Sequence, residues 1–109
     1  MRILGFLLGL LVAWSCRPGI QLTIHNTGGE ALDSLTVLTT GHAYDLGSLG
    51  PGQDQRLTIA STGESHVELV HGLLRRRLVL DVYFEPGYSG QISARVTTDS
   101  VLQVVSHVR

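Results

Sequence analysis

Five histidines are the side chains of this chain best suited to bind a metal ion: His25, His42, His66, His71 and His107. None of them belongs to the closely spaced Cys/His pattern that is typical of zinc sites. His66 and Glu68 are separated by one residue, so in a strand both side chains would project from the same face. Two ligands do not make a site. A metal-binding protein that uses His66, Glu68 and a partner such as His25 or His107 is therefore the alternative function, and solvated histidines with no cofactor are the favoured interpretation.

Residues for hydrolytic chemistry are present but follow no known catalytic spacing. The chain contains Ser, His and Asp, yet it lacks the Gly-x-Ser-x-Gly turn that exposes a nucleophilic serine in one large class of hydrolases. Glycoside hydrolysis needs two carboxyl groups that face each other across a cleft, and the nine acidic residues are scattered among expected turns and outer faces. The sequence predicts that the protein is not an enzyme.

Aromatic residues flank a Pro-Gly turn near residue 86 and make the most plausible recognition patch: Tyr83, Glu85, Pro86 and Tyr88. Tyrosines give a large contact area with a polar end, and binding residues are often found on loops held by a rigid scaffold. The alternative is structural, because Tyr88 could simply cover the end of the core. Both interpretations stay open.

Arg75, Arg76 and Arg77 form the one run of charge in the chain. The favoured interpretation is the solvated end of a hairpin, with Arg77 paired to Asp81 or to another acid on the outer face. The alternative is contact with anionic lipid headgroups, phosphate groups or an acidic partner, since each basic residue near an anionic membrane contributes about 1 kcal/mol.

The first fifteen residues have the composition of an export signal. Arg2 is followed by an apolar run over residues 3–14 and then by the small residue Ser15. The apolar run is shorter than the roughly 20 residues that a membrane-spanning helix needs. Residues 1–15 are therefore predicted to be the helix of a cleaved signal peptide.

The single cysteine follows this leader directly. Ala13-Trp14-Ser15-Cys16 resembles the lipobox of bacterial lipoproteins, in which a small residue precedes a cysteine that becomes lipid-modified and N-terminal. The resemblance implies a lipid anchor on Cys16 and a short tether over residues 16–18. It also implies an outer membrane location facing the periplasm, because Arg17 stands where that family uses Asp as a retention signal. Export without lipidation, as a soluble periplasmic or secreted protein, is the alternative.

The rest of the chain, residues 19–109, is long enough for one domain and reads as strands and turns. The whole chain has a formal net charge of only −1, and the absence of a strongly basic balance argues against nucleic acid as a partner. Short alternating runs recur about every ten residues, and we expect Ile20, Leu22 and Ile24 to share the apolar face of the first strand. Ile92 and Ala94 should face the core in the seventh strand, and the third strand should end at a Gly50-Pro51-Gly52 turn. The expected strands lie within residues 20–25, 33–39, 44–49, 57–59, 67–69, 77–84, 92–96 and 101–108.

Seven or eight short strands with one apolar face each should pack as two antiparallel sheets. This organisation resembles an immunoglobulin-like or fibronectin-type sandwich. The segments 26–29, 44–52 and 85–88 also look like those of small bacterial envelope proteins that have no assigned activity.

Two of the expected strands carry further predictions. Residues 77–84 hold a period of two over the whole segment, which predicts a central strand. Residues 101–108 are apolar on both faces, so this strand is either buried on both sides or an edge that meets a partner. The predicted function is that of a non-catalytic binding or structural protein of the cell envelope. Its partners would be the membrane, through the anchor, and an envelope protein, through the last strand.

Overall fold

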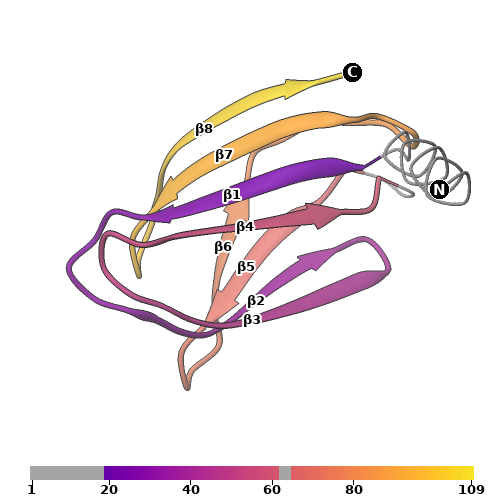
Figure 1. Ribbon diagram of the computed structural model, residues 1–109. Coiled ribbons are helices and arrows are strands. Elements are labelled where there is room, and N and C mark those ends of the chain that lie inside the picture. The colour runs from indigo at the N-terminus through magenta and orange to yellow at the C-terminus, as the bar shows by residue number, and fades with distance from the viewer. Residues whose placement is uncertain (1–18, 62–64) are drawn as a thin grey trace, which may run out of the picture.

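The computed structural model describes residues 19–61 and 65–109, and these residues form an all-β fold (Figure 1). The predicted signal peptide, Cys16 and the tether lie outside the described residues. Within the described part, no helix is long and apolar enough to cross a membrane. The eight strands are β1 (Ile20–Asn26), β2 (Leu32–Thr39), β3 (His42–Leu49), β4 (Asp54–Ile59), β5 (Val67–His71), β6 (Arg76–Leu80), β7 (Gly90–Val96) and β8 (Val101–Val108).

The strands form two four-stranded sheets that lie one over the other (Figure 1). One sheet has the order β4-β1-β7-β8 and the other β3-β2-β5-β6. The prediction of a wholly antiparallel sandwich is wrong in one place, because β1 and β7 pair in parallel. The chain reaches β7 from β6 in the opposite sheet, and such a crossover, unlike a hairpin, does not force the next strand to run antiparallel.

The core lies between the two sheets and follows from alternation along the strands. In β1, Ile20, Leu22 and Ile24 are fully buried, while the residues between them are partly exposed. Ile92 and Ala94 of the neighbouring β7 are buried in the same way. This is the pattern expected when successive side chains point to opposite faces of a sheet. The predicted inward faces of these strands are confirmed.

The sixth strand differs from the prediction in its length and its position. β6 ends at Leu80 instead of residue 84, and it lies at an edge of its sheet instead of the centre. Phe84 is nevertheless buried and Val82 packs against the core. Apolar residues at every second position therefore indicate an extended backbone with one buried face. They do not indicate whether that backbone is hydrogen-bonded to a neighbouring strand.

Asn26 is the buried polar residue that fixes the loop after β1. Its Nδ2 donates to the carbonyl oxygens of Glu30 at 2.8 Å and Leu49 at 3.0 Å, and its Oδ1 accepts from the N–H of Gly28 at 3.1 Å. All of these partners belong to the loop itself or to the end of β3. The amide thus joins the end of β1 to the opposite sheet, and its hydrogen bonds offset the cost of burying it.

Gly90 is required where β7 meets β8. Its φ is +133°, and a Cβ built on it would lie 2.2 Å from the carbonyl oxygen of His107 and 2.9 Å from the Cα of Val108. No side chain fits into this space. The absence of a Cβ therefore allows the last residues of β8 to pair closely with the start of β7.

Candidate functional site

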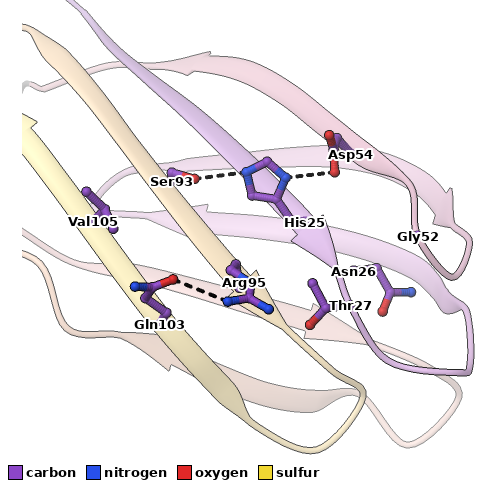
Figure 2. Close-up of a pocket in the computed structure, with 9 residues that line it drawn as sticks. All are labelled: His25, Asn26, Thr27, Gly52, Asp54, Ser93, Arg95, Gln103 and Val105. Atoms are coloured by element: carbon purple, nitrogen blue, oxygen red, sulfur yellow. Dashed lines mark hydrogen bonds and ion pairs between the residues drawn. The ribbon is translucent and has the colours of Figure 1, made fainter.

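A chain of hydrogen bonds joins a histidine, an acid and a serine on the outer face of the first sheet (Figure 2). The Nδ1 of His25 lies 2.7 Å from Oδ1 of Asp54. The Nε2 of the same ring lies 2.9 Å from Oγ of Ser93. The three residues come from β1, β4 and β7, which are adjacent strands. This is the arrangement in which an imidazole links a carboxylate to a hydroxyl.

The strand register explains why these side chains meet. His25 is the direct cross-strand partner of Asp54, and on the other side of β1 the strand β7 carries Ser93 opposite Thr23. Thr23 and His25 alternate with buried residues and therefore point outward. Because an ionised carboxylate only accepts hydrogen bonds, the proton of the neutral ring resides on Nδ1, and Nε2 accepts from the Ser93 hydroxyl.

These residues line a shallow depression of about 250 Å³. Arg95 is the arginine that lines the depression, and Figure 2 shows its guanidinium directed toward Gln103 of β8. That contact is long, with 3.5 Å between Nη1 and Oε1. Val105, also on β8, forms part of the wall. The side chains of His25 and Asp54 are 31% and 59% exposed, so solvent and small solutes reach the ring and the carboxylate.

The sequence did not point to this cluster. Twenty-nine residues separate His25 from Asp54, and 68 separate His25 from Ser93. No local motif surrounds any of the three. Only the pairing of β1 with both β4 and β7 places them together, and that pairing includes the parallel contact that alternation does not reveal.

His66 and Glu68 do share a face, as predicted, and their side chains are in contact. His66 Nε2 lies 2.6 Å from Oε2 of Glu68, and Arg77 Nη1 donates to Oε1 of the same carboxylate at 2.8 Å. The hydrogen bond from Arg77, followed by that from His66, lowers the pKa of Glu68 below its usual value. Within the described residues, no group of three or more His, Cys, Asp or Glu side chains converges as metal ligands would.

The three arginines of the charge run point to different partners. Arg75 donates to the carbonyl oxygen of Ser34 at 2.7 Å and to Oγ1 of Thr36 at 3.0 Å. Arg76 forms an ion pair with Asp99. Arg77 forms an ion pair with Glu68 and not with Asp81. Of the two alternatives expected for Arg77, the structure thus has the pairing with another acid of the outer face. The run is therefore tied into its own sheet and to the turn between β7 and β8.

The structure separates the residues of the predicted recognition patch into two groups. Tyr83 is exposed, and its hydroxyl donates to Oε2 of Glu85 at 2.5 Å, which raises the pKa of Tyr83. Pro86 is also exposed, in the turn closed by a 3.0 Å hydrogen bond from the N–H of Tyr88 to the carbonyl of Glu85. Tyr88 itself is half-buried and packs against the core. Its carbonyl accepts from Ser61 Oγ at 2.7 Å.

The last strand, β8, is an edge strand, which is one of the two placements expected for it. Its register with β7 is shifted at Val96, and from Gln103 to Val108 the pairing is continuous. Two apolar side chains on it are well exposed, Leu102 at 56% and Val105 at 40%. Among the edge strands of the described residues, β3 carries Asp45, β4 carries Asp54 and Arg56, and β6 carries Arg76 and Arg77, whereas β8 carries no Asp, Glu, Lys or Arg.

Comparison with known proteins supports the fold alone. No family model matches the chain, and no curated protein matches it. A protein from Eubacterium rectale, with a structure solved by NMR, is similar in fold, with a TM-score of 0.53 and 9% sequence identity. The similarity covers 78% of this chain and 87% of that one. The class of protein defined here is thus a small all-β domain of two packed sheets.

Proposed function

We propose that this protein is an exported, lipid-anchored protein of the bacterial cell envelope that binds an extended segment of another envelope protein along β8. The observation that carries the proposal is the character of this edge. β8 is long, contains no Asp, Glu, Lys or Arg, and exposes Leu102 and Val105. We take the domain to be a variant of the immunoglobulin-like sandwich.

Unpaired backbone groups at a sheet edge pair readily with another strand, and proteins usually guard such edges with charged residues, bulges or short strands. The other three edges of this sandwich have such guards. β3 carries Asp45, and β4 and β6 also carry charged residues. β8 has a shift in register at Val96 but none of these charges, so it is the edge at which an added strand meets the least electrostatic opposition.

The chemistry of β8 defines the segment that it would accept. Backbone hydrogen bonds would supply affinity, and alternate side chains would supply selectivity. Val104 and Val108 pack against the core, and Val105 lies between Gln103 and His107 on the outer face. The strand thus favours a partner segment with apolar residues at alternate positions and polar, uncharged residues between them.

The proposed anchor would place this edge close to the membrane. Ile20 pairs with Gly90, and Gly90 pairs with Val108. The start of β1, the start of β7 and the end of β8 therefore share one end of the sheet. A lipid on Cys16 would tether this end, so that the beginning of β8 points away from the bilayer. Two or three acyl chains would make the attachment lasting, whereas a single chain gives marginal binding.

Site-specific photo-crosslinking in living cells tests the binding edge. A photoreactive residue replaces Val105 on β8, and the matched control replaces Val79 on β6, which is also an edge valine and is 60% exposed. We expect a crosslinked product of defined mass from position 105 and none from position 79. Leu102→Lys or Val105→Lys should reduce the product at least tenfold when the crosslinker is placed at Gln103. Equal crosslinking at positions 79 and 105 would contradict the proposal. A product that contains two copies of this chain would also contradict it, because β8 would then pair with another copy of itself and not with a different envelope protein.

The intact mass of the protein purified from its native host tests the anchor. A mass of residues 16–109 plus acyl groups is expected. The bare mass of that span would mean soluble export, and the full-length mass would mean that no cleavage occurs. Cys16→Ser should move the protein out of the membrane fraction, and if it does not, the lipid is not what holds the protein there.

A further inference from the structure

We infer that Ser93 is a nucleophile activated by His25 and Asp54, and that this face of the sheet hydrolyses small esters through an acyl-serine intermediate. This activity goes beyond partner binding and uses the polar groups of the depression shown in Figure 2, whose wall also includes Gln103 and Val105 of β8. It departs from the sequence-based expectation that the chain is not an enzyme.

The geometry meets the requirements for an activated serine. The distances of 2.9 Å from Ser93 Oγ to His25 Nε2 and of 2.7 Å from His25 Nδ1 to Asp54 Oδ1 both lie within hydrogen-bond reach. The carboxylate bonds one ring nitrogen and the hydroxyl bonds the other. This order leaves the nitrogen nearest the serine free to accept a proton, which is the tautomer that a general base needs.

Three adjacent strands hold the cluster in place. β1 lies between β4 and β7 in one continuous sheet, so the backbone of each residue is fixed by its neighbours. Catalytic groups built on such elements are positioned more reliably than groups on loops. The side chains therefore need no rearrangement of the backbone to act together.

The reaction balances with these groups and water alone. Ser93 Oγ forms a bond to the ester carbonyl carbon, and its proton moves to His25 Nε2, while Asp54 balances the charge of the imidazolium. When the carbonyl re-forms, the bond to the leaving oxygen breaks, and His25 returns the proton to the departing alcohol. Water then attacks the acyl-serine with His25 again as the base, which releases a carboxylic acid and restores Ser93.

Arg95 is the group that can stabilise the negative charge on the carbonyl oxygen during this reaction. It is the cross-strand partner of His25 and follows Ser93 by two residues, so it points to the same face. Its long contact with Gln103 leaves guanidinium N–H donors available. Because the site is open to water, this stabilisation is weaker than in a closed pocket, and activated esters are the suitable probes.

A fluorophosphonate probe tests the inference on the full-length chain in detergent. The probe forms a covalent bond with activated serines, and peptide mass spectrometry reports which serine is modified. Ser106, an exposed serine on the adjacent β8, is the internal control. We expect modification of Ser93 at least tenfold faster than of Ser106, and loss of this preference in His25→Gln and in Asp54→Asn. Equal modification of the two serines in a protein that circular dichroism shows to be folded would overturn the inference.

Hydrolysis of p-nitrophenyl acetate separates the role of Ser93 as nucleophile from the role of Arg95 in stabilising the negative charge. Ser93→Ala should reduce turnover to the level of buffer plus free imidazole, and Ser106→Ala should leave it unchanged. Arg95→Gln should lower turnover of the ester by about tenfold, while fluorophosphonate still modifies Ser93. Turnover that persists in Ser93→Ala would assign the activity to another group and refute the proposed nucleophile. None of these outcomes depends on crosslinking at β8, so the two proposals fail separately.

Discussion

Replacing Gly90 by Ala should detach the end of β8 from β7. The new Cβ would lie 2.2 Å from the carbonyl oxygen of His107, and carbon atoms of this kind essentially never approach other heavy atoms closer than 3.0 Å. The obstructing atoms belong to the backbone of His107 and Val108, so no side-chain rotation relieves the overlap. β8 must therefore move away from β7, and the hydrogen bonds near Gly90 must lengthen or break.

The loss of stability in Gly90→Ala has two parts that a control variant can separate. The backbone conformation of Gly90, with φ at +133°, costs an alanine roughly 1–3 kcal/mol, because residues with a Cβ rarely adopt it. The overlap adds about 1–3 kcal/mol, as overpacking does in a filled interior. Gly47 on the edge strand β3 also has a positive φ, +77°, but its Cβ would meet nothing within 4 Å. Gly47→Ala should therefore show the backbone cost alone, about 1 kcal/mol, against about 3 kcal/mol for Gly90→Ala.

Far-UV circular dichroism measures the stability of both variants, with urea denaturation giving the free energy of unfolding and thermal denaturation giving Tm. In a domain of this size, 1 kcal/mol corresponds to roughly 4–8 °C in Tm, so we expect Gly90→Ala to lower Tm by about 15 °C and Gly47→Ala by about 5 °C. Hydrogen exchange should show the loss of protection concentrated in the amides of residues 106–108. If the two variants lose the same stability, or if the exchange of β8 amides is unchanged, the close approach of β8 to Gly90 is not what the structure indicates.

Three further predictions concern polar contacts. Asn26→Asp places an acceptor against two carbonyl oxygens and should lower the free energy of unfolding by about 3 kcal/mol at pH 7. Chemical denaturation should show part of this loss recovered at low pH, where the new carboxyl group is protonated. A loss that does not depend on pH would contradict the role given to the Asn26 amide. Glu68→Gln should destabilise by roughly 0.5–1 kcal/mol at neutral pH, a modest value because Arg77 is largely exposed. Because the folded-state pKa of Glu68 is lowered from 4.5, its contribution is complete above 4.5 and disappears as the pH falls through the lowered value; denaturation curves of both proteins from pH 7 to pH 3 should converge, and a constant difference would refute the ion-pair explanation. Tyr44→Phe removes the hydroxyl that accepts the N–H of Ala60 at 3.1 Å and should cost about 1 kcal/mol in a urea titration, whereas no change would mean that water replaces the contact.

Alternation along the chain determined the fold class and the buried faces. The sequence predicted the inward residues of β1 and β7, the position of β8 as one of two alternatives, and a turn at residues 50–52 that the structure closes with a hydrogen bond from the N–H of Gln53 to the carbonyl of Gly50. These features are local, because a period of two and a preference for positive φ are properties of neighbouring residues.

Tertiary structure alone decided which strands became neighbours and in which direction. The burial of Phe84 extended the pattern of β6 beyond its last hydrogen-bonded residue, and the crossover into β7 produced the parallel contact with β1. The juxtaposition of Ser93, His25 and Asp54 depends on that contact. A side chain's face is set by its own strand, but its neighbours on that face are set by residues far away in the sequence, and the alternation within one strand carries no information about them.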